Sequence, residues 1–544
     1  MDVSGTNVKS GGKNLIVNQV TKVTGTGKLT IPETDDDKDS YVLTAKKGIH
    51  VATGGTVLFE NNAQLMQDVD ASNSGNVKME RKTKMKKMDY IYWGTPVQGD
   101  ATSGQILLNT TNPDLETSSG GFSPGTPNKR IYRYNEPNDY FVATTDAYFI
   151  PGKGYAIRGK HGNGDTKTAD TFSFTGTPNN GDAITVSVQR SPNNAYNHGY
   201  NLIGNPYPSG LNFDEFATDN IASIKGTAWF WSNLEDNLYQ SGSTNSTHNN
   251  YAVLTLAGGS PPTTGAGGLA EYTPTENIKV GQGFIVQVRD ELASTSLETR
   301  TLVFKNDMRT TGAGVFFNNP KKLSPIKNRY WLRFVSPDNV VNTILLAHLT
   351  NATDGYDQDY DAELFTVGDD SFYSLLGTKK LQIQAKGEFV QDAKIDIATK
   401  QNQDGNYTIQ LEQPEGAFAN GQAVYLHDKL NGTYTNLLEK SYTFAATKGT
   451  DESRFEIVYK DGVVLGVGNA SKSDFIVYRN GSDFVVKSSK ILGKVEVYDT
   501  AGRLVFAQTT SNNILKLDTS RLPEGVFIIK AENSGDIKTK KILK

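Results

Sequence analysis

The chain has 544 residues, a formal net charge of −4 at pH 7 and no cysteine. This length exceeds what one hydrophobic core supports and predicts several domains. The charge excludes nucleic-acid binding through a basic surface, and the lack of cysteine excludes disulfides, thiolate-bound metals and a cysteine nucleophile. The 53 glycines, 25 tyrosines and 24 phenylalanines, without long helical patterns, favour an all-β chain with several β-sandwich or β-rich modules in tandem.

Residues 1–80 contain short apolar runs separated by small polar turns. Examples are LIV at 15–17, LTI at 29–31 and VLF at 57–59. This spacing predicts a β-helix-like segment or a tight meander. We expect its first strands to stack on further rungs. The opening residues lack the basic start and apolar core of a signal peptide. We therefore expect either a mature form or, as the favoured interpretation, the C-terminal piece of a longer protein.

Two phrases occur twice between residues 81 and 325. YWGTPV at 92–97 is echoed by NLIGNPY at 201–207, and PGKGYAIR at 151–158 is echoed by VGQGFIVQ at 280–287. The repeats predict two related β modules, one over 81–198 and a second over 199–325. The paired glycines predict positive φ or close backbone contact before an aromatic strand. A phosphate-binding loop is not favoured, because no helix follows either glycine pair.

The second module contains a polar insertion beside a group of aromatic residues. Aromatic rings next to polar loops are typical of sugar-binding surfaces, so Trp229, Trp231 and Tyr239 are candidate glycan contacts. Alternation along a strand makes core packing of at least one of these tryptophans the favoured interpretation. A carbohydrate-binding module of a secreted polysaccharide-degrading enzyme is therefore the alternative function that we keep open.

Residues 326–460 contain six or more strand-like runs without a helical pattern, which predicts a β-sandwich. Within it, an acidic run places carboxylates two residues apart. Such spacing can wrap a calcium ion, although the run lacks the offsets of an EF-hand, and a hydrogen-bonded acidic surface loop is the favoured alternative. The candidate calcium ligands are Asp354, Asp357, Asp359 and Asp361.

The catalytic motifs that a sequence can reveal are missing. The six histidines have no metal-ligand spacing, and neither a Gly-x-Ser-x-Gly nor a His-Glu-x-x-His motif occurs. A pair of glycosidase carboxylates distant in sequence stays open. We expect that the chain is not an enzyme and needs no cofactor, apart from the calcium considered above.

The last domain, 470–544, has the clearest pattern. Four β-type runs, DFIVY at 474–478, DFVVK at 483–487, GKVEVY at 493–498 and GVFIIKA at 525–531, are separated by turn residues. The pattern predicts a small Ig-like antiparallel sandwich.

Three blocks of this domain resemble the type A C-terminal sorting domain of Bacteroidetes proteins exported by the type IX secretion system. They are VEVYDTAGRLV at 495–505, LDTSRLPEGVFIIK at 517–530 and the terminal KTKKILK at 538–544. One departure is VYRNG at 477–481, where the family often has Tyr-Pro-Asn-Pro. The repeated phrases also resemble a module that precedes the sorting domain in large surface proteins.

The resemblance implies a secreted, cell-surface protein associated with the outer membrane. It implies recognition by the type IX translocon and a PorV-type outer-membrane shuttle. From the net charge we expect no nucleic-acid partner, and from the aromatic residues above we keep surface glycans as further candidates. We therefore expect the C-terminal stalk and sorting region of an adhesin-like protein. The candidate recognition residues are Val526, Phe527, Ile528, Ile529, Lys538, Lys540, Lys541, Ile542, Leu543 and Lys544.

Overall fold

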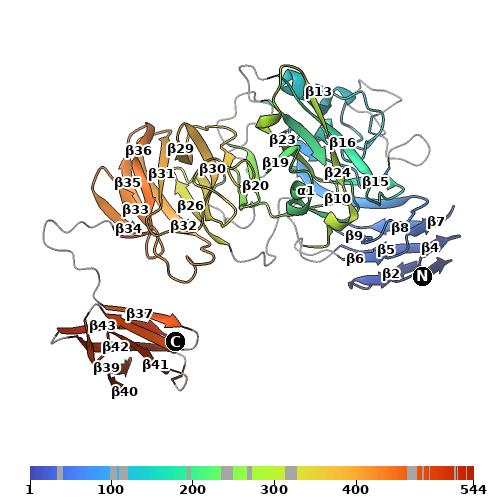
Figure 1. Cartoon of the computed structure of the whole chain (residues 1–544). Helices are drawn as coiled ribbons and strands as arrows, with labels where there is room; N and C mark the ends of the chain where they lie inside the picture. Colours follow the sequence, from blue (N-terminus) through green and yellow to red (C-terminus); the bar gives the residue numbers. More distant parts are fainter. Residues whose placement is uncertain are drawn as a thin grey trace. The chain divides into compact units, whose positions relative to one another are not determined.

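The computed structural model divides the chain into a large unit, Met1–Gly462, and a C-terminal unit, Val463–Lys544. The all-β prediction is confirmed, since strands dominate both units (Figure 1). No helix in the described part of the chain is long and apolar enough to cross a membrane. The structure describes residues 1–5, 7–33, 41–98, 107–108, 121–192, 198–233, 249–265, 273–312, 327–461, 475–480, 483–488, 490–519, 522–523, 525–533 and 536–544.

The large unit begins with a β-helix, one of the two arrangements that the short apolar runs predicted. Nine strands form three parallel sheets, in the orders β1-β4-β7, β2-β5-β8 and β3-β6-β9, and the blue strands of Figure 1 are stacked accordingly. Alternate side chains such as Leu29, Ile31 and Phe59 point inward and are buried. The strands are Asp2–Ser4, Asn7–Lys9, Leu15–Val17, Thr21–Thr24, Lys28–Ile31, Val42–Ala45, Ile49–Val51, Thr56–Phe59 and Gln64–Met66.

The repeated phrases lie on equivalent strand pairs. β11 (Tyr90–Trp93) pairs with β14 (Tyr155–Arg158), and β17 (Tyr200–Gly204) pairs with β23 (Gly283–Val288), both antiparallel. Trp93 is opposite Tyr155 in the first pair, just as Ile203 is opposite Phe284 in the second. The register of the two copies is therefore the same.

The two copies are interlocked rather than placed one after the other. The Gly94 N–H donates to the Gly281 carbonyl over 2.9 Å, and the Gly204 N–H donates to the Gly152 carbonyl over 3.0 Å. A Cβ on Gly281 would lie 2.9 Å from the Phe174 ring, which belongs to the first copy. Each Gly-x-Gly turn is thus packed against the other copy, which explains why glycine is needed there.

The outer strands of the two copies follow the same plan. β10 pairs with β15, and it also continues the β-helix beside β8, whereas β16 pairs with β24. One short helix, α1, covers the second copy. The first copy comprises β10 (Val77–Met85), β12 (Ile131–Asn135), β13 (Tyr140–Ala143) and β15 (Thr168–Gly176); the second comprises β16 (Ile184–Arg190), β18 (Gly210–Asn212), α1 (Phe213–Asp219), β19 (Ile224–Trp231), β20 (Tyr251–Thr255), β21 (Gly258–Ser260), β22 (Asn277–Ile278), β24 (Glu298–Phe304) and β25 (Arg309–Thr310).

The remainder of the large unit is one eleven-stranded sheet. It encloses an aromatic core in which Phe334 stacks on Tyr407 and Phe372. Its strands are β26 (Asn328–Val335), β27 (Val341–His348), β28 (Ala362–Glu363), β29 (Ser371–Leu376), β30 (Lys379–Lys386), β31 (Lys394–Gln401), β32 (Gly405–Glu412), β33 (Tyr425–Asp428), β34 (Thr433–Asn436), β35 (Tyr442–Ala446) and β36 (Gly449–Val458).

The C-terminal unit is the predicted small β-sandwich. A three-stranded sheet, β37-β38-β41, and a four-stranded sheet, β40-β39-β42-β43, share one buried core that includes Val486, Val497 and Ile529. The strands are β37 (Phe475–Asn480), β38 (Asp483–Ser488), β39 (Leu492–Asp499), β40 (Leu504–Thr509), β41 (Ile514–Leu517), β42 (Val526–Asn533) and β43 (Asp536–Leu543).

Candidate functional site: the C-terminal sandwich

The first of the three sequence blocks forms the hairpin between β39 and β40. The Asp499 carboxylate accepts hydrogen bonds from the backbone of Ala501 and Arg503 and from the Arg503 guanidinium. These donors favour the charged form and lower the pKa of Asp499. Gly502, with φ +78°, lets the chain turn where a side chain would be strained. The Asp-Thr-Ala-Gly-Arg sequence is therefore a turn motif.

The second and third blocks meet at the chain end. Gly525 and Lys544 exchange backbone hydrogen bonds of 3.3 and 2.9 Å, which extends the β42–β43 pairing to the end of the chain. The Lys544 ammonium donates to the carbonyls of Thr519 and Leu522. The last lysine is thus bound by the second block, and its charge is used inside the domain.

The candidate recognition residues of β42 and β43 divide between two faces. Paired residues of antiparallel strands share a face. Two pairs are on the core-facing side of the sheet: Phe527 with Ile542, and Ile529 with Lys540. The pair between them, Ile528 with Lys541, faces outward. Phe527, Ile529 and Ile542 are buried, so they are unavailable to a partner while the domain is folded. Val526 is half-buried, and of Leu543 only the backbone pairing with Val526 is described.

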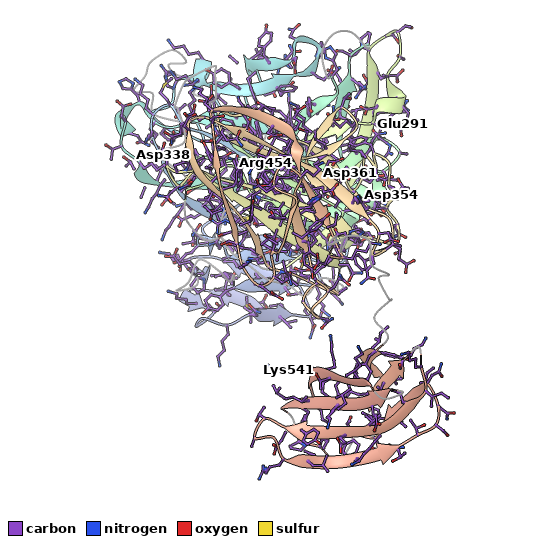
Figure 2. All side chains as sticks on the ribbon, turned by 90° about the vertical axis from the view of Figure 1, so that its left-hand side faces the viewer. Glu291, Asp338, Asp354, Asp361, Arg454 and Lys541 are labelled. Atoms are coloured by element: carbon purple, nitrogen blue, oxygen red, sulfur yellow. The ribbon has the colours of Figure 1, made fainter. Side chains whose placement is uncertain are left out.

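Three lysines of β43 are exposed: Lys538, Lys540 and Lys541. Lys541 is labelled on this unit in Figure 2. The described residues give none of the three an ion-pair partner, and β43 is an edge strand of its sheet. Lys538 and Lys540 extend from the core-facing side of this edge. Inward-facing charges on an edge strand oppose indiscriminate pairing with other strands.

The centre of the same sheet has its charges compensated. The Glu496 carboxylate lies 2.7 Å from the Lys494 ammonium and 3.3 Å from the Lys530 ammonium, and it accepts a hydrogen bond from Tyr498. These contacts lower the pKa of Glu496 to about 2, with the bond from Lys494 as the largest cause. Within this sheet, the lysines that have no ion-pair partner among the described residues are therefore those of the β43 edge.

Exposed apolar side chains also occur on both outer faces of this unit. Ile528 and Ile537 lie on the four-stranded sheet beside the β43 lysines, and Ile537 is 63% exposed. On the three-stranded sheet, Ile476 and Ile514 flank Lys487 in one row of paired residues. Of these outward-facing residues, only Ile528 was predicted from the sequence as a contact; Ile537, Ile476 and Ile514 could have been found from their alternation with buried residues.

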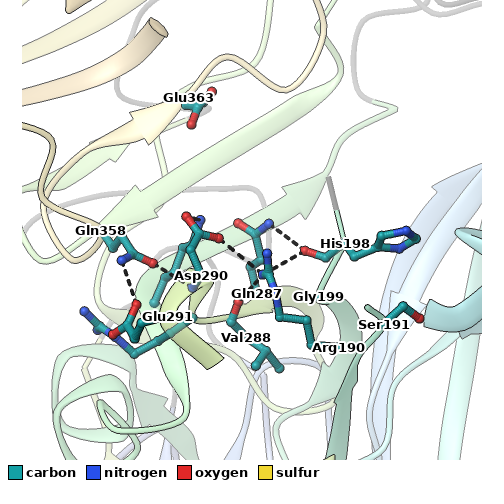
Figure 3. Close-up of polar contacts among 12 residues, drawn as sticks. Arg190, Ser191, His198, Gly199, Gln287, Val288, Asp290, Glu291, Gln358 and Glu363 are labelled. Atoms are coloured by element: carbon teal, nitrogen blue, oxygen red, sulfur yellow. Dashed lines mark hydrogen bonds and ion pairs between the residues drawn. The ribbon is translucent and has the colours of Figure 1, made fainter. Parts of the chain in front are cut away.

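The acidic run of the large unit is held in place by protein groups. Asp359 accepts hydrogen bonds from the Gly226 N–H, over 2.9 Å, and from Arg289, over 2.7 Å, so it ties this run to the second copy. Its neighbour Gln358 accepts from Asp290 and donates to Glu291 (Figure 3).

The other three aspartates have different partners. Asp361 is buried and accepts from the backbone N–H groups of Asp357 and Ala385, both over 2.8 Å. The Asp357 carboxylate accepts from the Thr353 N–H, and Asp354 is ion-paired with Lys386. Burial raises the pKa of Asp361 to about 7. Figure 2 labels Asp354 and Asp361 in the large unit. Among the described residues there is no group of three or more His, Cys, Asp or Glu side chains arranged to hold a metal ion.

The candidate glycan contacts of the large unit lie in or beside a core. Trp229 is 4% exposed and packs against Tyr200 and Phe365, so its ring faces are covered. Trp231 is half-buried and stacks on Tyr92. Tyr239 lies outside the described residues.

Comparison with known proteins gives two matches. Residues 4–459 match the family model described as a domain of unknown function (DUF8693), and residues 479–544 match the one described as a secretion system C-terminal sorting domain. A search of curated proteins finds no match.

Proposed function

The chain belongs to the DUF8693 family and ends in a secretion system C-terminal sorting domain, and from this premise we propose that it is the C-terminal stalk and sorting region of a cell-surface, adhesin-like protein. The sorting domain marks the chain as cargo of the type IX secretion system, which carries it across the outer membrane and with whose machinery it interacts. The adhesin-like role, the shuttle as partner and the contacts below are the proposal.

The observation that carries the proposal is the uncompensated basic edge of the C-terminal unit. A partner strand that pairs with the free side of β43 adds backbone hydrogen bonds. An acidic surface on that partner is attracted to the three exposed lysines, and this charge complementarity makes the contact specific. We assign this contact to the translocon and a PorV-type shuttle, with Ile528, Lys538, Lys540 and Lys541 as the contacting residues.

The large unit has the features that a stalk requires. Its β-helix is tied to the second copy, because the Leu65 N–H donates to the Pro208 carbonyl over 2.8 Å. The second copy is tied to the eleven-stranded sheet, because the Trp331 indole donates to the Gly259 carbonyl over 2.8 Å. Modules joined in this way resist bending under load, so the large unit can itself present an adhesive surface as one rigid piece.

We also propose that the large unit is not catalytic. Ser191, His198 and Glu136 lie close together, but the arrangement does not activate the serine, because its hydroxyl contacts the carboxylate and not the histidine. The Ser191 hydroxyl donates to the Glu136 carboxylate over 2.6 Å, while His198 lies 3.7 Å from that carboxylate. The His198 carbonyl accepts from Arg190 and Gln287 (Figure 3). Nucleophilic catalysis needs the base on the hydroxyl instead.

The experiment is surface display in a host with a type IX system. The whole chain is compared with one that ends at Gly462, and protease-accessible protein on intact cells is measured together with attachment of those cells to host-derived surfaces. We expect display and attachment for the whole chain and neither for the shortened one. Display without any gain in attachment would refute the adhesin-like role and leave the sorting role intact.

A further inference from the structure

A cavity of about 430 Å³ lies where the second copy meets the eleven-stranded sheet. Its volume is within the range of about 300–1,000 Å³ that small-molecule sites occupy. It is lined by α1, by the end of β20, by the start of β26 and by the turns that follow β27. The lining includes Asp214, Leu256, Lys327, Leu349, Asn351 and Tyr360.

Two charged groups of the lining have unused hydrogen-bonding capacity. The Asp214 carboxylate accepts no hydrogen bond from the described residues, although its own N–H is capped by Asn212. The Lys327 ammonium donates to the Leu256 carbonyl over 2.6 Å, which uses one of its three N–H groups. Burial raises the pKa of Asp214 to about 6 in spite of the nearby Lys327 charge. The cavity therefore offers both an acceptor and donors that have no partner among the described residues.

The walls that carry the other groups are fixed by hydrogen bonds. Tyr360 is held by its N–H, which donates to the Asp357 carbonyl over 3.0 Å, and by its own carbonyl, which accepts from Thr255 over 3.1 Å. Its hydroxyl is hydrogen-bonded to the Asn351 side chain. An aromatic ring with a polar tip, placed beside Leu256 and Leu349, forms an amphipathic wall.

The balance of charge indicates the kind of ligand. One carboxylate and one ammonium leave the lining neutral, so neither an anion nor a cation is favoured by net charge. A sugar ring presents neighbouring hydroxyl groups that both donate and accept, and an apolar face of C–H groups that packs on aromatic rings. We propose that this cavity binds one ring of a neutral saccharide, with Asp214 and Lys327 on its hydroxyl groups and Tyr360 against its apolar face.

A larger cavity of about 520 Å³ lacks these features. Its arginine, Arg454, is hydrogen-bonded through two nitrogens to the buried carboxylate of Asp428, at 3.0 and 2.7 Å. Its aspartate, Asp451, accepts from the backbone of Ser453 and Arg454. These two groups are already satisfied within the protein, and the remaining charged group of the lining, Lys448, has no free carboxylate beside it among the described residues of that lining. That cavity therefore lacks the combination of a free acceptor and free donors found beside Tyr360.

The test uses the whole chain and saturation-transfer NMR with the methyl glycosides of glucose, galactose, mannose and N-acetylglucosamine, and with methyl glucuronide as the anionic probe. We expect at least one neutral glycoside to bind. Asp214→Asn and Tyr360→Ala each weaken that binding by about tenfold or more, because a hydrogen bond to a charged group or a stacked ring is lost. Glu215→Gln is the matched control, since Glu215 is exposed on the same helix and does not line the cavity.

Melting curves establish that each variant is folded, and Tyr360→Phe, which keeps the ring, retains binding. Absence of binding by every neutral glycoside, preference for the glucuronide, or full binding by both Asp214→Asn and Tyr360→Ala would overturn the proposal. The proposed saccharide site rests on the proposed surface role, but different results would refute the two proposals. Cells that display the chain and attach equally well with Asp214→Asn refute only the cavity, whereas displayed wild-type chain that confers no attachment refutes the adhesin-like role.

Discussion

The terminal lysine is predicted to stabilise the C-terminal unit rather than to contact a partner. Lys544→Met removes an ammonium that donates to the carbonyls of Thr519 and Leu522, while the backbone pairing with Gly525 stays possible. A hydrogen bond to a charged group contributes about 1.5–3 kcal/mol when it is shielded. The Lys544 side chain is half-buried, so we expect a net loss of about 2 kcal/mol for the pair.

The matched variant is Lys541→Met, because Lys541 is exposed and has no partner among the described residues. Differential scanning calorimetry of the whole chain resolves the transition of the C-terminal unit. A loss of about 2 kcal/mol lowers the melting temperature of a domain of this size by about 8 °C or more. Equal melting temperatures for the two variants would refute the assignment of Lys544 to the interior.

Two further predictions concern the large unit. Gly281→Ala should destabilise the large unit by about 2 kcal/mol or more, because φ is +72° and the new methyl group meets the Phe174 ring. Gly162→Ala is the control, since a methyl group there enters open space. Chemical denaturation of both variants checks the prediction, and equal stabilities would contradict the interlocked copies. Burial among aromatic rings lowers the pKa of His348 from 6.5 to about 4. The folded state therefore favours the neutral imidazole, and the stability that neutral His348 contributes is complete above pH 6.5 and is lost as the pH falls towards 4. The free energy of unfolding should therefore decrease over that interval by up to about 3 kcal/mol, and His348→Phe should flatten the decrease.

Local patterns were sufficient for much of the fold. Alternation in runs such as Leu29 and Ile31 encodes a buried face at every second residue, and it led to the β-helix. The Gly-x-Gly phrases marked equivalent positions in two copies. No local pattern encodes how the two copies interlock, because the carbonyl that accepts from Gly94 belongs to Gly281, which is far along the chain.

The same limit applies to the candidate sites. Carboxylates two residues apart favoured a hydrogen-bonded acidic loop over a calcium site, but the spacing did not identify the groups that hold Asp359, which are Gly226 and Arg289 from another module. The cavity that contains Asp214 and Tyr360 is built from four separate segments and leaves no signature in any of them. The terminal lysines looked alike in sequence, and what separates Lys544 from the exposed lysines of β43 is the position of the Thr519 and Leu522 carbonyls, which accept from its ammonium.

The most direct measurement of the central claim is the salt dependence of shuttle binding together with secretion, for the whole chain carrying Lys538→Glu, Lys540→Glu and Lys541→Glu. These side chains are exposed, so the domain should remain folded, and Lys487→Glu on the other sheet is the control. We expect weakened binding at low salt, a smaller difference at high salt because exposed charges are screened, and cargo that accumulates inside the cell. Normal surface display of the triple variant would contradict the proposal that the β43 edge is read by the secretion machinery.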